Sequence, residues 1–301
     1  MHTMEEFEGM YLPKSTIFCT CQDRYDRIGG EFNCELDNVN KALIKDEFLN
    51  EVNIEGIIYP FIYKDVYQSG VCYVIVALEK ERDLKIAKYI YNIAKKKDIL
   101  TIGIGIKPSL SQNKEFREIC DSRIEMLKNN LDSLVLIDNE ILENSENIIL
   151  DDIEKQSNDN VIATLKSMIY PISLPGVINI EVSDLKYVMS GNTIAYIGFG
   201  SASGDNKAEI AAEQAINSKL LVEPLKKAAK QLLMIEGGPS MDLMEIYKAT
   251  KKITDVSDCD TSNIFFGAVI NEDLKDEIRV SIVASGYDVR KIKNISFKES
   301  I

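Results

Sequence analysis

The stretch that decides the fold is Pro175–Ile216, which reads PGVINIEVSDLKYVMSGNTIAYIGFGSASGDNKAEIAAEQAI. It opens with a turn and a polar segment, Asn179–Asp184, whose last two residues can cap a short helix over residues 185–189. The apolar run Thr193–Phe199 predicts a strand, and Lys207–Asn217 predicts a helix. A loop, a helix, a strand and a second helix in this order indicate an α/β protein.

Upstream, apolar runs alternate with amphipathic helical patterns. The runs are almost wholly apolar, as expected for strands that are buried on both faces of a parallel sheet. The segments between them carry apolar residues at helical spacing. This alternation predicts a parallel α/β sheet from strands at Val71–Leu78, Ile99–Ile106 and Ser133–Ile137 with helices at Asp83–Lys97 and Phe116–Asn129.

The pattern is less regular at the N-terminus and in the middle of the chain. A first strand is predicted at Ser15–Cys21 and a second at Phe32–Leu36, with Asp37–Leu43 leading into a helix. Asn158–Tyr170 has one strongly apolar helical face and is expected to lie between two lobes, with Pro171 ending or kinking that helix. Beyond it, the sequence predicts a second α/β domain with a mixed sheet, from strands at Gln231–Glu236, Ile264–Ile270 and Arg279–Ala284 and a helix at Met241–Lys251.

Composition excludes several classes of function. The 301 residues carry a net charge of −13, which argues against binding to nucleic acid and against direct electrostatic binding to a membrane. No apolar segment of transmembrane length or signal-peptide type is present, so a cytoplasmic protein is expected. The lone histidine, His2, argues against hydrolysis with a histidine base, and the six scattered cysteines indicate reduced thiols and no metal site.

Several ordered motifs resemble one family. They are ILTIGIGIKP at residues 99–108, the strand that ends in Ile137-Asp138-Asn139, the pair Asn158-Asp159, the loop Asn179–Asp184, and EIRVSIVASG at residues 277–286. In order and spacing these motifs resemble the FtsZ branch of the tubulin superfamily. The resemblance implies a Rossmann-like N-terminal lobe with a parallel sheet, a central helix, and a mixed-sheet α/β C-terminal domain. The implied boundaries are residues 1–157, 158–176 and 177–288, followed by a short tail at 289–301.

The sequence departs from the family where phosphates are bound. In FtsZ, the strand matching Val71–Ala77 is followed by a glycine-rich loop, whose bare backbone N–H groups approach the phosphates. Here that stretch is Leu78–Leu84, LEKERDL, and it brings Glu79, Glu81 and Asp83 instead. A carboxylate about 4 Å from a phosphate is repelled by roughly 4 kcal/mol at an effective dielectric constant near 20. The N-terminal lobe is therefore predicted to be degenerate. The first glycine loop is missing as well, since the first strand is followed by QDRY, and the next helix looks shortened.

The base pocket is half kept. The resemblance implies that Asn139 and Asp159 are remnants of a nucleotide pocket. Three other positions of the family's pocket carry different residues here: Glu154 for the stacking aromatic, Gln112 for a glutamate on the ribose, and Phe116 for an arginine. Arg117 could restore that arginine after a local shift of one position.

In the family, carboxylates of the loop matching Asn179–Asp184 reach across a subunit contact to the neighbour's GTP. Here the resemblance assigns those catalytic positions to Glu181 and Asp184, beside Asn179. Glu181 replaces an Asp and is one methylene longer, which misplaces a catalytic group. The alternative is that these residues only cap the next helix.

These observations favour an FtsZ-like filament-forming protein that assembles, or that caps or regulates an FtsZ filament, without GTP of its own. Its partners would be further copies of itself or a genuine FtsZ, and it would need no cofactor. The alternative is an active or weak GTPase that uses GTP and Mg²⁺ at subunit contacts. A third hypothesis is a binding module for an unrelated ligand.

Overall fold

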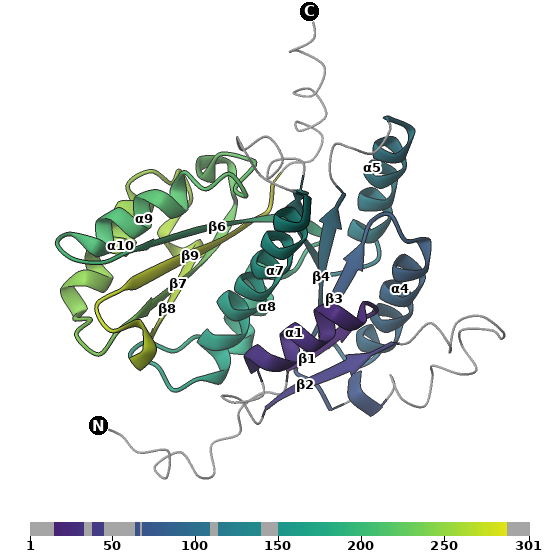
Figure 1. Cartoon of the computed structure of the whole chain (residues 1–301), viewed down its shortest axis with the longest axis horizontal. Helices are drawn as coiled ribbons and strands as arrows, with labels where there is room; N and C mark the ends of the chain where they lie inside the picture. Colours follow the sequence, from purple (N-terminus) through teal and green to yellow (C-terminus); the bar gives the residue numbers. More distant parts are fainter. Residues whose placement is uncertain are drawn as a thin grey trace, which may run out of the picture.

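The computed structural model describes residues 15–32, 38–44, 64–66, 68–108, 114–139 and 150–287 (Figure 1). Its centre is a nine-stranded sheet in the order β2-β1-β3-β4-β5-β6-β9-β7-β8. The strands from β2 to β6 pair in parallel, and β9 runs antiparallel to both of its neighbours. The strands are β1 (Ser15–Cys19), β2 (Val39–Leu43), β3 (Val71–Ala77), β4 (Leu100–Lys107), β5 (Ser133–Asp138), β6 (Thr193–Ala202), β7 (Lys230–Gly237), β8 (Ile264–Ile270) and β9 (Ile278–Ser285).

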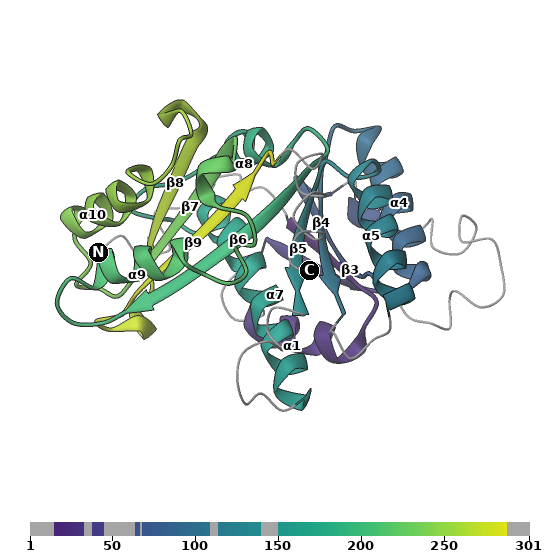
Figure 2. The ribbon, with the colours of Figure 1, turned by 90° about the horizontal axis from the view of Figure 1, so that it is seen from above.

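Helices cover both faces of the sheet, and each face has its own apolar core (Figure 2). One core holds side chains of α4 (Glu81–Lys95), α5 (Lys114–Lys128), α9 (Lys207–Ile216) and α10 (Leu243–Thr254). The other holds side chains of α1 (Gln22–Phe32), α7 (Leu150–Ser173) and α8 (Val182–Met189). Short 3₁₀ helices of the described residues include Leu225–Lys227, Thr261–Asn263 and Glu272–Leu274. Alternate residues of β3 enter the two cores, as the period of a strand requires. None of the described helices combines the length and the apolar character that a membrane crossing demands.

The long strand β6 joins the two halves of the sheet. Its first three residues pair in parallel with Ser133–Val135 of β5, and Ala195–Ala202 pair with β9. The parallel lobe and the mixed-sheet lobe, which the sequence predicts as separate units, therefore share one continuous sheet. Helix α7 packs beside this junction, with contacts to β5, β7, β8 and β9. The fold class predicted from the sequence is confirmed.

The N-terminal prediction was wrong in detail. Phe32, the predicted start of a strand at Phe32–Leu36, is the last residue of α1, and residues 39–43 of the predicted helical start at Asp37–Leu43 form β2. Residues 33–37 lie outside the described residues. Tyr25, Ile28 and Phe32 recur at helical spacing, and Ile28 and Phe32 are almost fully buried. The Gly29-Gly30 pair obscured this pattern, because glycine lowers helix propensity by about 1 kcal/mol.

The central helix is longer than predicted. Helix α7 begins at Leu150, whereas the sequence predicts a start at Asn158. The prediction missed the first turns because they are polar and carry no apolar periodicity. It also continues two residues beyond Pro171. The proline therefore lies in the last turn, where it removes a backbone hydrogen bond only at the end of the helix.

Glycines in β6 serve close packing. A β-carbon on Gly200 would lie 2.0 Å from the backbone oxygen of Ala211, and one on Gly198 would lie 2.2 Å from that of Ala215. Helix α9 thus packs directly against the backbone of β6. This contact explains the first two glycines of the sequence GFGSASG without a phosphate ligand.

Candidate functional site

The turn between β3 and α4 uses its own backbone amides. The Asp83 carboxylate, in a residue only 2% exposed, accepts the Ala77 N–H with its Oδ2 at 3.1 Å. The Leu78 N–H donates to Ile106 O, and the Lys80 N–H donates to Ala77 O. An internal carboxylate therefore stands in the first turn of α4, where helix N-termini favour negative charge.

Basic side chains hold the same turn from outside. Arg123 donates from Nη1 to the carbonyl oxygen of Leu78 at 2.7 Å, and Arg82 Nε lies 3.4 Å from Asp83 Oδ1. Glu81 is exposed and pairs with Lys85, and Glu79 is half-buried, so Asp83 is the one of the three predicted carboxylates that is almost fully buried. Sequence analysis missed Arg123, which no motif or spacing marks.

Helix α1 begins directly after β1, where the first glycine loop would lie. The Tyr25 N–H donates to Cys21 O, and the Cys19 thiol donates to the same oxygen. Burial raises the pKa of Cys19 to about 11, opposed by its hydrogen bond to Cys21 and by the nearby Arg24. The thiol is therefore neutral at physiological pH and is no nucleophile.

The two predicted remnants of the nucleotide pocket have different surroundings. Asn139 follows β5, and its buried Oδ1 has no hydrogen-bond partner among the described residues. Asp159 lies on α7 and forms an ion pair with Arg27 of α1, at 3.6 Å. Its neighbour Asn158 accepts a hydrogen bond from Arg24 Nε at 2.7 Å. Within the described residues, Asn139 Oδ1 therefore forms no hydrogen bond that would link it to Asp159. The partners Arg24 and Arg27 were not found from the sequence.

Part of the predicted pocket cannot be placed. Gln112 lies outside the described residues, and for Phe116 and Arg117 only the backbone, in α5, is described. Glu154, at the position of the base-stacking aromatic, lies on α7 with an exposed side chain.

The three residues of the predicted contact loop meet at the start of α8. Asn179 Oδ1 accepts the Gly176 N–H at 2.8 Å, and Asp184 Oδ2 accepts the Glu181 N–H at 3.0 Å. The Glu181 carboxylate also accepts a hydrogen bond from the Ser183 hydroxyl. A helix cap is therefore present, although α8 begins at Val182 and its N-cap residue is Glu181, three residues earlier than predicted. Because Asn179 and Glu181 are exposed, the cap leaves these side chains accessible to a partner.

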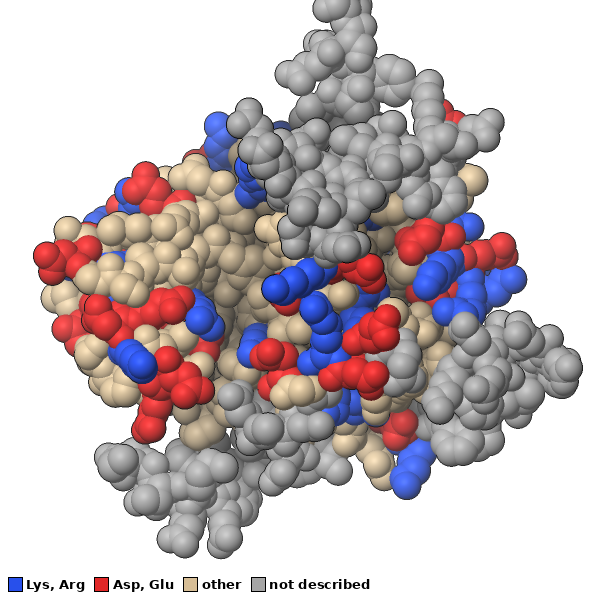
Figure 3. All heavy atoms as spheres, in the orientation of Figure 1, with Lys and Arg blue, Asp and Glu red and all other residues tan. Residues whose placement is uncertain are grey.

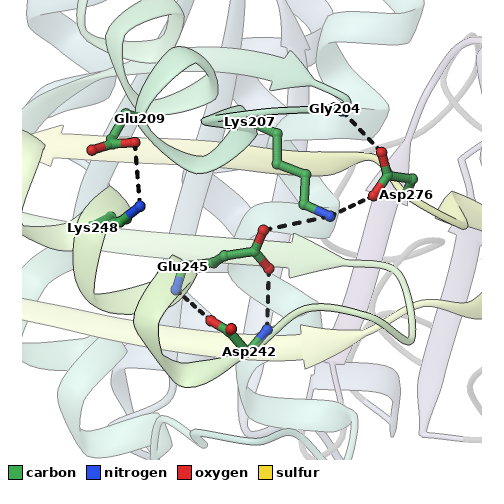
Figure 4. A network of polar contacts seen from close by, with 7 residues as sticks. All are labelled: Gly204, Lys207, Glu209, Asp242, Glu245, Lys248 and Asp276. Atoms are coloured by element: carbon green, nitrogen blue, oxygen red, sulfur yellow. Dashed lines mark hydrogen bonds and ion pairs between the residues drawn. The ribbon is translucent and has the colours of Figure 1, made fainter.

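A second polar network fixes the far end of the C-terminal lobe (Figure 4). The buried Lys207 ammonium lies 2.7 Å from Asp276 and 3.5 Å from Glu245, and Asp276 also accepts the Gly204 N–H. Glu245 and Asp242 cap α10 reciprocally. The network thereby ties the first turns of α9 and α10 to the loop before β9.

Comparison with known proteins agrees with this architecture. A family model described as "FtsZ family, C-terminal domain" matches residues 193–288. The cell division protein FtsZ of Rickettsia bellii is 36% identical over 209 residues, which make up 68% of this chain and 46% of that relative. The chain is an FtsZ-like member of the tubulin superfamily. It spans just under half the length of that FtsZ relative.

Solved FtsZ structures share the fold. A variant of FtsZ from M. jannaschii superposes with a TM-score of 0.82 at 22% identity, over 95% of both chains. An FtsZ dimer from the same organism, described as empty, gives the same score and identity over 95% of this chain and 92% of its own. At this identity the likeness concerns the fold alone.

Proposed function

We propose that this FtsZ-like protein assembles into filaments, or caps or regulates an FtsZ filament, without binding or hydrolysing GTP. The observation that carries the proposal is the turn between β3 and α4. Its Ala77 N–H is committed to Asp83, and the amides of Leu78 and Lys80 are committed to backbone carbonyls. A triphosphate would have to displace a buried carboxylate and then lie beside it.

The balance of energies supports the proposal. At about 4 Å, two like charges repel by roughly 4 kcal/mol at an effective dielectric constant near 20. A helix N-terminus offers about 0.3–1 kcal/mol to an anion. Asp83 already occupies this favourable position. The glycines that let a backbone approach phosphates closely are absent from Leu78–Leu84.

The surface near the contact loop supports assembly. Ile178 and Ala268 form an antiparallel bridge, so the loop lies against the edge strand β8. Phe266 and Ile270, which lie two residues before and after Ala268, are exposed on the same side of that strand.

Helix α10 has three exposed apolar side chains of its own, Leu243 (69% exposed), Met244 and Tyr247. Exposed apolar side chains of this kind often mark protein–protein contacts. Another copy of the chain would bury them, in line with the dimer solved for the similar FtsZ.

One observation favours the alternative of a weak GTPase. Within the part of the chain that the structure describes, the buried Asn139 Oδ1 has no hydrogen-bond partner, which is uncommon in folded proteins and leaves an acceptor that a ligand could satisfy. In that case Glu181 and Asp184 of a neighbouring subunit would face the bound GTP, with Mg²⁺ as its counter-ion.

Calorimetry and sedimentation separate the two functions. The purified protein is first assayed for retained nucleotide, then titrated with GTP and with GDP, each with and without Mg²⁺. We expect no binding at micromolar concentration, and sedimentation that does not depend on GTP. Binding at that level, or sedimentation only with GTP, would favour the GTPase.

The versions of the proposal differ in the partner. Sedimentation alone indicates self-assembly, whereas an effect only on added FtsZ indicates a capping or regulatory role. A protein that neither sediments nor affects FtsZ would rule out both. Glu181→Lys should abolish the effect, and Glu118→Lys, an equal charge change at an exposed position of α5, should preserve it.

A further inference from the structure

Polar and aromatic side chains join α1 to α7 along both helices. Figure 3 shows Lys and Arg interspersed with Asp and Glu over the part of the surface where these helices lie. The contacts follow each other in the same order on the two helices, which therefore run side by side in the same direction. We call them the α1–α7 clamp: Arg24–Asn158, Arg27–Asp159, Glu31–Lys166 and Phe32–Tyr170.

The first contact is the more buried of the two arginine contacts. Arg24 Nε donates to Asn158 Oδ1 at 2.7 Å, and Asn158 is 5% exposed. A guanidinium is always charged and weakly hydrated, so it suits a buried contact. Hydrogen bonds from charged donors are stronger than neutral ones, and a buried amide oxygen left without a donor is costly.

The second contact is weaker. The Arg27 and Asp159 side chains are 40% and 60% exposed, and their charged atoms are 3.6 Å apart. An exposed ion pair of this kind contributes little, because water and salt screen it. Arg27 therefore offers a matched control for Arg24: the same side chain on the same helix, facing the same partner helix.

The far end of the clamp is largely apolar. The buried rings of Phe32 and Tyr170 meet edge to face, with centroids 6.2 Å apart. Lys166 pairs with Glu31 at 2.6 Å, and its ammonium lies over the Tyr170 ring. This end anchors the second half of α7, which leads into the contact loop.

We propose that the α1–α7 clamp is a built-in conformational lock, in which Arg24 fixes α7 to the N-terminal lobe by side-chain contacts alone. Asp159, which the FtsZ resemblance assigns to a nucleotide pocket, and its neighbour Asn158 here bind the arginines of the chain itself. The lock rests on the proposed function, since it lets α7 keep one position without GTP.

The lock extends to the contact loop through the end of α7. The Ile180 N–H donates to Pro171 O at 3.1 Å, and Ile178 is bridged to Ala268 of β8. A fixed α7 therefore keeps the loop before α8 ready for assembly, and a loosened α7 leaves it poorly positioned.

Hydrogen exchange of the full chain tests the lock directly. In Arg24→Ala we expect the amides of α1 and α7 to exchange about ten- to a hundredfold faster, the range for loss of a hydrogen bond with a charged donor. In Arg27→Ala the increase should stay below about fivefold. In both variants the amides of α10 should keep wild-type rates. In Arg24→Ala the protein concentration needed for sedimentation should rise.

A double-mutant cycle keeps the test decisive. Asn158→Ala removes the buried acceptor, so the double variant Arg24→Ala/Asn158→Ala should exchange more slowly than the two single effects predict. If Arg24→Ala does not fold, Arg24→Lys, which keeps a charged donor, takes its place in the same cycle.

Unchanged exchange in α7, equal effects of Arg24→Ala and Arg27→Ala, or additive effects in the cycle would overturn the lock. GTP-dependent sedimentation of the wild-type protein would instead overturn the proposed function. The hydrogen-exchange test of the lock does not depend on that result.

Discussion

Asp83 Oδ2 accepts the Ala77 N–H at 3.1 Å, which links the first turn of α4 to the last residue of β3. The two residues lie six positions apart, and the bond closes the turn between them. Both are buried. The carboxylate thus satisfies an amide that would otherwise be left without a partner inside the protein, where such amides are costly.

Asp83→Ala should lower the free energy of unfolding by about 1–3 kcal/mol, because the Ala77 N–H then stays buried and unpaired. Asp83→Asn keeps an acceptor oxygen and should lose less. Urea denaturation followed by circular dichroism measures both. Glu81→Ala, in the same turn but exposed, is the control and should match the wild type. Wild-type stability of Asp83→Ala would show that the bond is dispensable.

Gly200→Ala should destabilise the fold, because its β-carbon would lie 2.0 Å from the backbone oxygen of Ala211 and α9 would have to move. We expect a loss of about 1–3 kcal/mol, as for other overpacked sites. Gly30→Ala should instead raise the free energy of unfolding. A β-carbon there meets nothing within 4 Å, and alanine stabilises a helix by about 0.5–1 kcal/mol over glycine. The melting temperatures of the two variants check this prediction. A shift in the same direction for both variants would contradict it.

The fold was readable from the sequence where patterns were long and regular. The apolar strands β3, β4 and β5 and the amphipathic helix α4 lie close to their predicted positions, because burial on both faces or on one face fixes the residue pattern directly. Helix α1 and the start of α7 were mispredicted, since their polar turns and glycines carry no such pattern.

The candidate site was only partly predictable. Motif likeness indicated the loop from Asn179 to Asp184, and the structure confirms the helix cap. The acidic residue in the first turn of α4 was noticed, but not its bond to Ala77. The contacts Arg24–Asn158 and Arg123–Leu78 join residues 134 and 45 positions apart, and no local spacing reports such pairs.

The Lys207–Asp276 pair predicts a pH dependence. Its hydrogen bond to Asp276 raises the pKa of Lys207 above the usual 10.5, and the same bond lowers the pKa of Asp276 below the usual 3.8. The carboxylate contributes stability above pH 3.8 that is lost as the pH falls through its lowered pKa. The ammonium contributes stability below pH 10.5 that is lost as the pH rises through its raised pKa.

Asp276→Asn should therefore lower the melting temperature at neutral pH, and the difference from the wild type should shrink as the solution becomes strongly acidic. Melting curves recorded from pH 3 to pH 8 measure this trend. Lys248→Met, which breaks the looser 3.8 Å pair with Glu209, is a suitable control and should show a smaller difference. A difference that is independent of pH would mean that Asp276 acts by packing and not by charge.

The cap and the contact roles of the loop before α8 can be separated with two variants. Asp184→Ala removes the acceptor of the Glu181 N–H and should cost about 1 kcal/mol of stability, as the loss of a helix cap does. Glu181→Gln keeps a side-chain oxygen at the N-cap position of α8 but removes the exposed negative charge, so it should leave the melting temperature nearly unchanged. If the loop contacts a partner, both variants sediment less at equal concentration. Because Glu181→Gln keeps its stability, its sedimentation decides the question: wild-type sedimentation of this variant would mean that the loop only caps α8.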